Sequence, residues 1–102
     1  MAAYALTEAA ERDLAAIACY TVKTWGIDQA RRYAGILEIH FNGLEGETMR
    51  PRVFLKHRPE LLVTRCEHHY VFHRVRKDNC PLILAVYHES MDLMNRLRHR
   101  LE

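Results

Sequence analysis

The chain has 102 residues, of which 49% are hydrophobic and 27% are charged, and its formal net charge is +2. This length is typical of one domain, so we expect a single domain over residues 1–102 with one hydrophobic core. No apolar run approaches the ~20 residues of a transmembrane helix, and residues 1–6 lack the basic start of a secretory signal, so we expect a cytoplasmic protein without membrane contact.

The N-terminal segment predicts an amphipathic helix. Thr7 is a good N-cap, and Glu8 and Glu11 place negative charge in the first turn, where the helix dipole favours it. From Glu8 to Thr24 apolar residues recur at helical spacing. This stripe consists of Leu14, Ile17, Ala18, Cys19 and Val22. Gly26 then interrupts the pattern.

A second helix follows, with Asp28 as its expected N-cap and with Gly43 and Gly46 at its end. Its apolar stripe consists of Ala30, Tyr33, Ala34, Leu37, Phe41 and Leu44. Two amphipathic helices joined by a short connection fold back on each other, so we predict a helical hairpin.

The period of the apolar pattern changes after the hairpin. Residues 45–60 contain Pro51, Pro59 and many charges, so we expect an irregular connection with a short strand at 52–55. The segments that follow are rich in β-branched and aromatic residues and are too short for independent helices. They predict strands at residues 61–65, 69–76 and 82–88, with turns at 67–68 and 77–81.

Tight turns between consecutive strands make the sheet mostly antiparallel, and residues 4–6 can join its edge. The helical hairpin must cover one face, because so short a meander is marginal by itself. Residues 90–101 predict a final basic, amphipathic helix. The expected fold class is therefore α+β, with an N-terminal two-helix hairpin packed on a small, mostly antiparallel β-sheet and a short C-terminal helix.

The charge is unevenly distributed along the chain. Residues 1–49 carry four basic and seven acidic residues, whereas residues 50–102 carry eleven basic and six acidic ones, a balance of +5. Such a field favours an acidic partner or nucleic acid by electrostatic steering. A solubilising surface is an equally simple explanation of this charge.

Cysteines and histidines are the candidate metal ligands. The three cysteines are Cys19, Cys66 and Cys80. Their odd number and the lack of C-x-x-C spacing argue against a disulfide scaffold or a zinc ribbon, so we expect free, partly buried thiols. If a turn falls at residues 67–68, Cys66 and His68 do not converge with His69 and His73. We therefore expect no metal site and no cofactor.

Several segments along the predicted helices and strands resemble segments of a known family. They are residues 4–7 with Ala10, Asp13, Leu14 and Ile17; Tyr20-Thr21 with Trp25-Gly26; Gln29-Ala30 with Tyr33; Val71-Phe72-His73-Arg74; and Val86-Tyr87-His88 with Met91-Asp92. In this order and spacing they span almost the whole chain and resemble the ParE branch of the ParE/RelE toxin family. The chain departs from the family's pattern at His73, where a tyrosine is usual before Arg74. Residues 47–51 lack the usual Gly-Arg element, and residues 67–69 lack a common glycine.

The resemblance implies a RelE/ParE-like fold and the toxin of a type II toxin–antitoxin pair, neutralised by a ParD-like protein antitoxin that lies along it. ParE-type members poison DNA gyrase by stabilising its cleaved DNA complex. Such a toxin would meet nucleic acid only through gyrase or the antitoxin complex. RelE-type relatives on the same fold instead cut messenger RNA on the ribosome.

The two implied activities need different residues. An endoribonuclease needs a general base, a general acid and cations. Its candidates are Arg65, Arg74, Tyr87 and His88, with Lys56, His57 and His73 as further ones. A gyrase poison needs no catalytic residue, only a surface that prefers one state of the target. We place that surface on Met91, Met94, Arg96, Leu97, Arg98 and Arg100.

Each binding surface has a structural alternative. The apolar residues of the C-terminal segment could instead seal the core while its arginines are solvated. For the antitoxin we expect aromatic anchors at Tyr20, Trp25 and Tyr33, between the hairpin and the sheet. Trp25 and Tyr33 at helical spacing are also typical of core positions.

Overall fold

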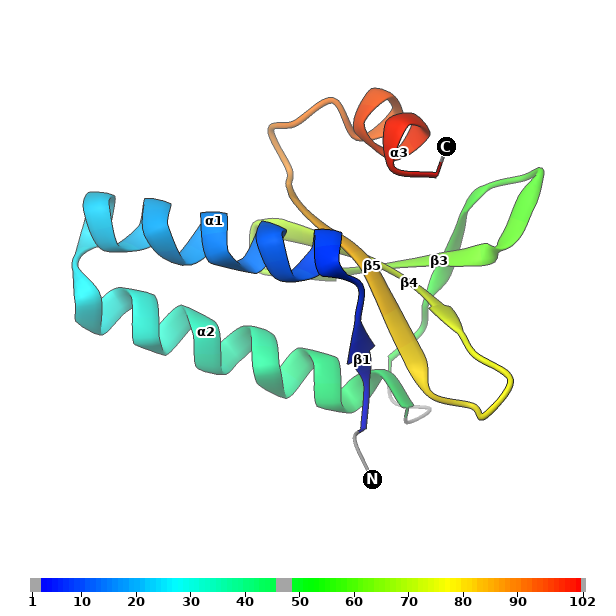
Figure 1. Cartoon of the computed structure of the whole chain (residues 1–102), viewed down its shortest axis with the longest axis horizontal. Helices are drawn as coiled ribbons and strands as arrows, with labels where there is room; N and C mark the ends of the chain where they lie inside the picture. The colour runs from blue at the N-terminus through cyan, green and yellow to red at the C-terminus, as the bar shows by residue number, and fades with distance from the viewer. Residues whose placement is uncertain (1–2, 46–48, 102) are drawn as a thin grey trace.

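The predicted helical hairpin forms in the computed structural model of the chain, which describes residues 3–45 and 49–101. Helix α1 spans Glu8–Trp25 and helix α2 spans Ile27–Asn42, and the two lie antiparallel (Figure 1). Thr7 caps α1 as expected, because its hydroxyl accepts a hydrogen bond of 3.1 Å from the Ala10 N–H. A one-turn 3-10 helix, η1 at Gly43–Glu45, follows α2, so Gly43 ends the α-helix as expected, and Gly46 lies outside the described residues.

Gly26 is the single residue between the two helices. Its φ of +93° lies in a region that residues with a Cβ rarely adopt. The expectation that Asp28 caps α2 is therefore wrong: Gly26 is the N-cap, and Asp28 lies in the first turn. The tight reversal at glycine starts the second helix before the aspartate is reached, and the carboxylate still faces the positive end of the helix dipole.

Five strands form one sheet in the order β1-β5-β4-β3-β2. They are β1 at Ala5–Leu6, β2 at Arg52–Leu55, β3 at Arg58–Cys66, β4 at His69–Val75 and β5 at Pro81–His88. β1 pairs with β5 in parallel, and the other neighbours are antiparallel. The α+β class with a mostly antiparallel sheet is thus confirmed.

The prediction of an irregular connection over residues 45–60 is wrong for its last three residues. β3 already begins at Arg58, which pairs with Leu55 across a tight turn at residues 56–57. The register of the two strands shifts between Val53 and Leu55. Pro59 lies near the start of β3, where a missing N–H is tolerated, so the proline does not exclude a strand.

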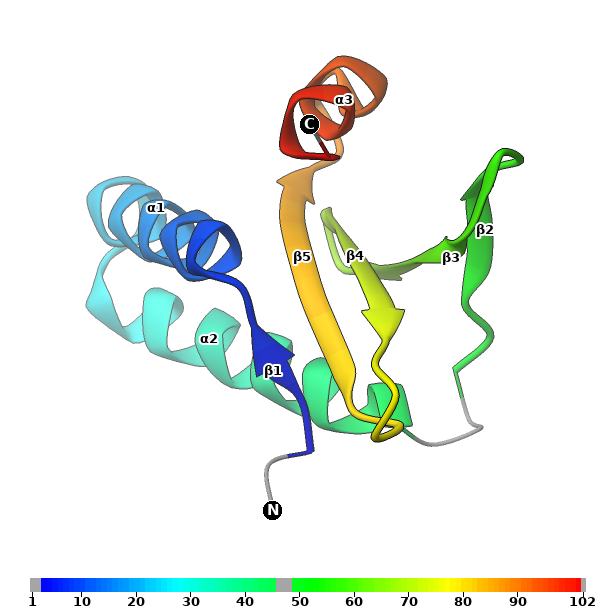
Figure 2. The same ribbon diagram turned by 45° about the vertical axis from the view of Figure 1, so that its right-hand side comes forward.

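The two faces of the sheet are covered by different helices (Figure 2). Val71, Ile83 and Val86 pack with Leu37 and Phe41 of α2 in one cluster. The opposite face carries helix α3 at Leu93–Leu101, and its cluster consists of Leu61, Phe72, Ala85, Tyr87 and Leu97. Along β5, Ile83 and Val86 face the hairpin, whereas Leu84, Ala85 and Tyr87 face α3. The usual alternation is interrupted at Leu84 and Ala85, where the register of β4 and β5 shifts.

Some residues of the predicted apolar stripes face solvent. Ala18, Cys19 and Val22 of α1 and Ala34 of α2 are exposed, because the sheet and the partner helix cover only a narrow face of each helix. Cys19 is consequently an exposed thiol, whereas Cys66 is buried, and all three cysteines are free. No helix in the described parts of the chain is long and apolar enough to cross a lipid bilayer.

Candidate functional site

A groove of about 1030 Å³ lies between α1 and the segment that leaves β5. Tyr20 and Trp25 of α1 line it together with Tyr33 of α2. Met91 and Arg96 line it from the C-terminal segment, and residues 67–69 and 86–88 line it from the strand ends. The groove thus brings together residues that the sequence suggests for two different binding surfaces.

The aromatic residues on the helical side differ in exposure. Tyr20 is 66% exposed and Trp25 is 70% exposed, so Trp25 is not the core residue that its helical spacing would allow. Tyr33 is partly buried against the core beneath the hairpin, and it also lines the groove.

Tyr33 and His69 form the buried polar contact of the groove. The Tyr33 hydroxyl lies 2.5 Å from Nδ1 of His69. Burial, with a smaller contribution from Cys66, raises the pKa of Tyr33 to about 12. Burial and the neighbouring His88 and His68 lower the pKa of His69 to about 4. Both groups are therefore neutral at pH 7, and the tautomer of His69 decides which of the two donates.

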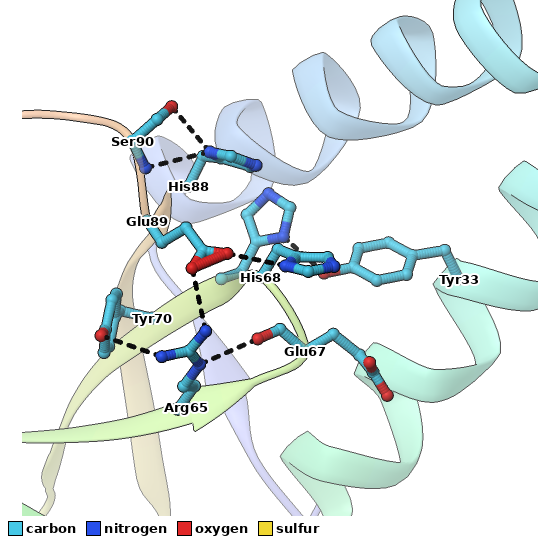
Figure 3. Close-up of polar contacts among 9 residues, drawn as sticks. Tyr33, Arg65, Glu67, His68, Tyr70, His88, Glu89 and Ser90 are labelled. Carbon is cyan, nitrogen blue, oxygen red and sulfur yellow. Dashed lines mark hydrogen bonds and ion pairs between the residues drawn. The ribbon is translucent and has the colours of Figure 1, made fainter.

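Beside this contact, Glu89 binds both Arg65 and His68 (Figure 3). We call these three residues the polar rim of the groove. One carboxylate oxygen accepts from Nη2 of Arg65 at 2.9 Å, and the other accepts from Nδ1 of His68 at 2.6 Å. The His68 hydrogen bond and the Arg65 charge hold the pKa of Glu89 below its usual value. Arg65 also donates to the Glu67 carbonyl oxygen. Through Arg65, the β3–β4 turn is therefore connected to Glu89, the residue that follows β5.

His88 lies beside this rim with a fixed orientation. The Ser90 N–H donates to Nδ1 of His88 at 3.1 Å, so a neutral His88 carries its proton on Nε2. Its ring centroid is 5.2 Å from that of His69 and 6.4 Å from that of His68. Within the described residues, no three histidine, cysteine or acidic side chains are placed to hold a metal ion. The gathering of three histidines was not predicted, because it depends on the pairing of His69 with His88 across two strands.

The four nuclease candidates do not converge. Arg65 and His88 lie at the end of the sheet where His69 pairs with His88, but Arg74 pairs with Leu82 near the other end. Arg74 lies five positions along β4 from His69, which corresponds to about 17 Å. Tyr87 is buried on the α3 face, and its hydroxyl donates to the Arg96 carbonyl oxygen at 3.4 Å.

The additional nuclease candidates are also dispersed. Lys56 and His57 form the exposed turn between β2 and β3. His73 is buried, with 1% of its surface exposed, and its Nδ1 has no hydrogen-bond partner in the described structure. Burial and the nearby His40 lower the pKa of His73, so it is a neutral core residue at pH 7.

The candidate target surface divides into buried and exposed residues. Leu97 is 1% exposed and packs in the cluster beneath α3, and Arg100 pairs with Asp13 of α1. These two residues hold α3 in place, as the core-sealing alternative requires. The remaining members of the surface are exposed: Met91, Met94, Arg96 and Arg98.

Comparison with known proteins identifies the family of the chain. Residues 4–93 match the model of the family described as the ParE toxin of the type II toxin–antitoxin system parDE. The chain is also 43% identical over 102 residues to Toxin ParE of Escherichia coli, covering 100% of this chain and 99% of that relative. The chain therefore belongs to the ParE toxin family of parDE type II toxin–antitoxin systems, which implies an antitoxin as its partner.

Proposed function

We propose that this toxin acts in the cytoplasm by binding DNA gyrase and stabilising its cleaved DNA complex, and that a ParD-like antitoxin holds it inactive. A poison of this kind needs only a surface with higher affinity for one state of its target. Membership of the ParE family and the exposed aromatic and basic residues around the groove support this mode of action.

The separation of Arg74 from His88 is the observation that carries the proposal. Phosphodiester cleavage needs its acid, base and cation within reach of one phosphate. The nuclease candidates lie at two ends and on two faces of the sheet. Toxicity by binding to a target protein therefore fits this chain better than toxicity by RNA cleavage.

The exposed C-terminal residues are our candidates for gyrase contact. Met91 and Met94 offer flexible apolar surface, and Arg96 and Arg98 form no ion pair in the described structure. Leu97 and Arg100 belong to the same surface as its supports, because they hold α3 on the sheet.

A gyrase supercoiling assay with purified toxin tests the proposal. We expect loss of supercoiling and accumulation of cleaved DNA, and reversal of both by the antitoxin. The double variant Arg96→Glu/Arg98→Glu should lose most of this effect. The matched variant Arg31→Glu/Arg32→Glu, which reverses two exposed arginines on α2, should keep it. Normal supercoiling at excess toxin, without trapped DNA, would sink the gyrase claim.

A ribosome-dependent mRNA endoribonuclease is the second candidate. The observation in its favour is the Glu89–His68 pair, because Nδ1 bound to a carboxylate leaves Nε2 of His68 free to act as a base beside His88 and Arg65. Mapping of message ends after toxin expression separates the two functions. In-frame cuts that vanish in His68→Gln or Arg65→Ala would replace the gyrase proposal with this one.

A further inference from the structure

The positive charge of residues 50–102 is unevenly paired in the fold. Of the eleven arginines and lysines in this part of the chain, four form ion pairs with carboxylates, and the other seven form none with the residues that the structure describes. The four paired ones are Arg58, Arg65, Arg76 and Arg100. Arg50, Arg52 and Lys56 are among the seven unpaired cations. All three are exposed, and no carboxylate lies between them along the chain, so unneutralised positive charge gathers on and beside β2.

These cations belong to a hairpin at the edge of the sheet, made of β2, the turn at residues 56–57 and the start of β3. We call residues 50–60 the basic hairpin. Figure 2 shows it on the side of the molecule away from α1 and α2, with β2 as the outermost strand. The Phe54 ring packs edge-on against Phe72 with centroids 5.1 Å apart, and Leu55 joins the same cluster. Apolar contacts therefore hold the basic hairpin on the sheet while its cations face solvent.

We propose that the basic hairpin binds the phosphate backbone of duplex DNA. Exposed arginines and lysines bind phosphates irrespective of sequence, because they release the counterions that surround DNA. The major groove of B-DNA is also wide enough to admit a two-stranded β-ribbon. This contact is direct, whereas the family resemblance implies that the toxin meets nucleic acid only through gyrase or the antitoxin complex.

The side chains of the basic hairpin favour duplex DNA over other acidic partners. A protein partner would need an aromatic or apolar anchor. Phe54 is the only Phe, Tyr or Trp of the basic hairpin and packs on the core, which leaves Val53 as its only exposed large hydrophobic residue. Single-stranded nucleic acid is held by stacking on exposed aromatic rings, and the same lack argues against it. Duplex RNA has a deep, narrow major groove that side chains do not reach.

DNA binding by the basic hairpin also extends the proposed function. The cleaved gyrase complex holds duplex DNA, so a toxin bound to gyrase could contact both the protein and its DNA. The basic hairpin would then add affinity for the complex that depends on salt. Only this step rests on the proposed function, because binding of DNA by the toxin alone requires no gyrase.

Titration of a fluorescent DNA duplex with purified toxin at a series of salt concentrations tests the contact. The logarithm of the binding constant should fall with the logarithm of the salt concentration with a slope of about −3, as expected when three cations each neutralise one phosphate. In Arg52→Gln/Lys56→Gln the slope should decrease in magnitude by about 2. The affinity of this variant at about 50 mM salt should be at least about tenfold lower than that of the parent toxin.

Two double variants serve as matched controls with the same change in net charge. Arg31→Gln/Arg32→Gln removes two exposed arginines of α2, and Arg96→Gln/Arg98→Gln removes two exposed arginines of α3. Both should keep the slope of the parent toxin. Because all the substituted side chains are exposed, the melting temperatures should stay unchanged and should show that each variant folds.

Gyrase assays and other nucleic acids extend the test. Single-stranded DNA and duplex RNA of the same length should bind at least about threefold more weakly than duplex DNA. With gyrase present, Arg52→Gln/Lys56→Gln should trap less cleaved DNA than the parent toxin does. If the parent toxin leaves gyrase unaffected, the proposed function fails, while the titration without gyrase still decides whether the basic hairpin binds DNA.

Four results would overturn the inference. The first is no salt-dependent binding of duplex DNA, and the second is tighter binding of single-stranded DNA or duplex RNA. The third is a slope that persists in Arg52→Gln/Lys56→Gln but is lost in Arg96→Gln/Arg98→Gln, which would place the contact on α3. The fourth is a hairpin variant that binds DNA like the parent toxin but aggregates, because its cations would then protect the edge strand β2 from pairing with other chains.

Discussion

Asp13, in the first half of α1, and Arg100, near the end of α3, form an ion pair with two hydrogen bonds of 3.0 Å although 87 residues separate them. The Asp13 carboxylate also accepts from the Val86 N–H at 3.0 Å, and Arg100 donates to the Leu84 carbonyl oxygen at 2.8 Å. The pair therefore connects α1, β5 and α3 at one point. Since α1 and the segment before α3 are the two walls of the groove, this contact helps to fix the separation of the walls.

Arg100→Gln should destabilise the protein by about 2–3 kcal/mol, because it leaves the largely buried Asp13 carboxylate without its cation. Arg98→Gln, which changes an exposed arginine on the same helix, should stay within about 0.5 kcal/mol of the parent protein. Urea unfolding measures both values. Equal stability of the two variants would show that the pair does not hold α3.

Leu97→Ala should cost about 2–4 kcal/mol, because Leu97 is buried against Leu61 and Phe72. Met94→Ala, an exposed change on the same helix, should be nearly neutral in the same unfolding experiment. A truncation of residues 93–102 would remove Leu97 and uncover this cluster. Loss of toxicity in the truncated chain would therefore report unfolding as well as loss of the target surface, so the exposed point variants are the cleaner test.

Gly26→Ala and Gly35→Ala should change stability in opposite directions. Alanine at position 26 must adopt a φ of +93°, which should cost about 1–3 kcal/mol even though no atom lies within 4 Å of the added methyl group. Gly35 lies in the middle of α2 with open space around it, so alanine there should stabilise by about 0.5–1 kcal/mol. Thermal unfolding of both variants checks the signs, and a neutral Gly26→Ala would contradict the strain argument.

Stability should fall as the pH decreases from about 6.5 to 4. The unfolded chain binds a proton at His69 near the ordinary pKa of 6.5, whereas the folded protein binds it only near 4. The unfolded state therefore holds more protons in this window, and acid favours it by up to about 3 kcal/mol. The groups that face the His69 ring are Tyr33, His88, His68, Glu89 and Cys66.

The His69→Gln variant isolates this contribution. Its stability should depend less on pH between 7 and 4 than that of the parent protein, because glutamine can still form a hydrogen bond with Tyr33 but does not titrate. His57→Gln removes an exposed histidine from the β2–β3 turn and should leave the slope unchanged. Urea unfolding at a series of pH values measures the slopes. Parallel curves for His69→Gln and the parent would assign the acid sensitivity elsewhere, with buried His73 as the next candidate.

The sequence by itself determined the parts of this protein that depend on neighbouring residues. The Thr7 cap, the break at Gly26 and the change from helical to strand periodicity predict the hairpin and four of the strands within a few residues of their observed ends. These signals are local, because a cap, a helical turn or a strand pleat involves residues at most four positions apart. The order of family-like segments along the chain likewise led to the correct family.

Only the tertiary structure decided how distant residues combine. The sequence leaves open whether Trp25 is core or surface, because helical spacing is the same for both, and the fold exposes it. The contact of Asp13 with Arg100 and the gathering of His68, His69 and His88 depend on strand order and register. For the same reason the sequence suggested antitoxin and target surfaces as two places, whereas packing brings α1 and the exit of β5 to the two sides of one groove.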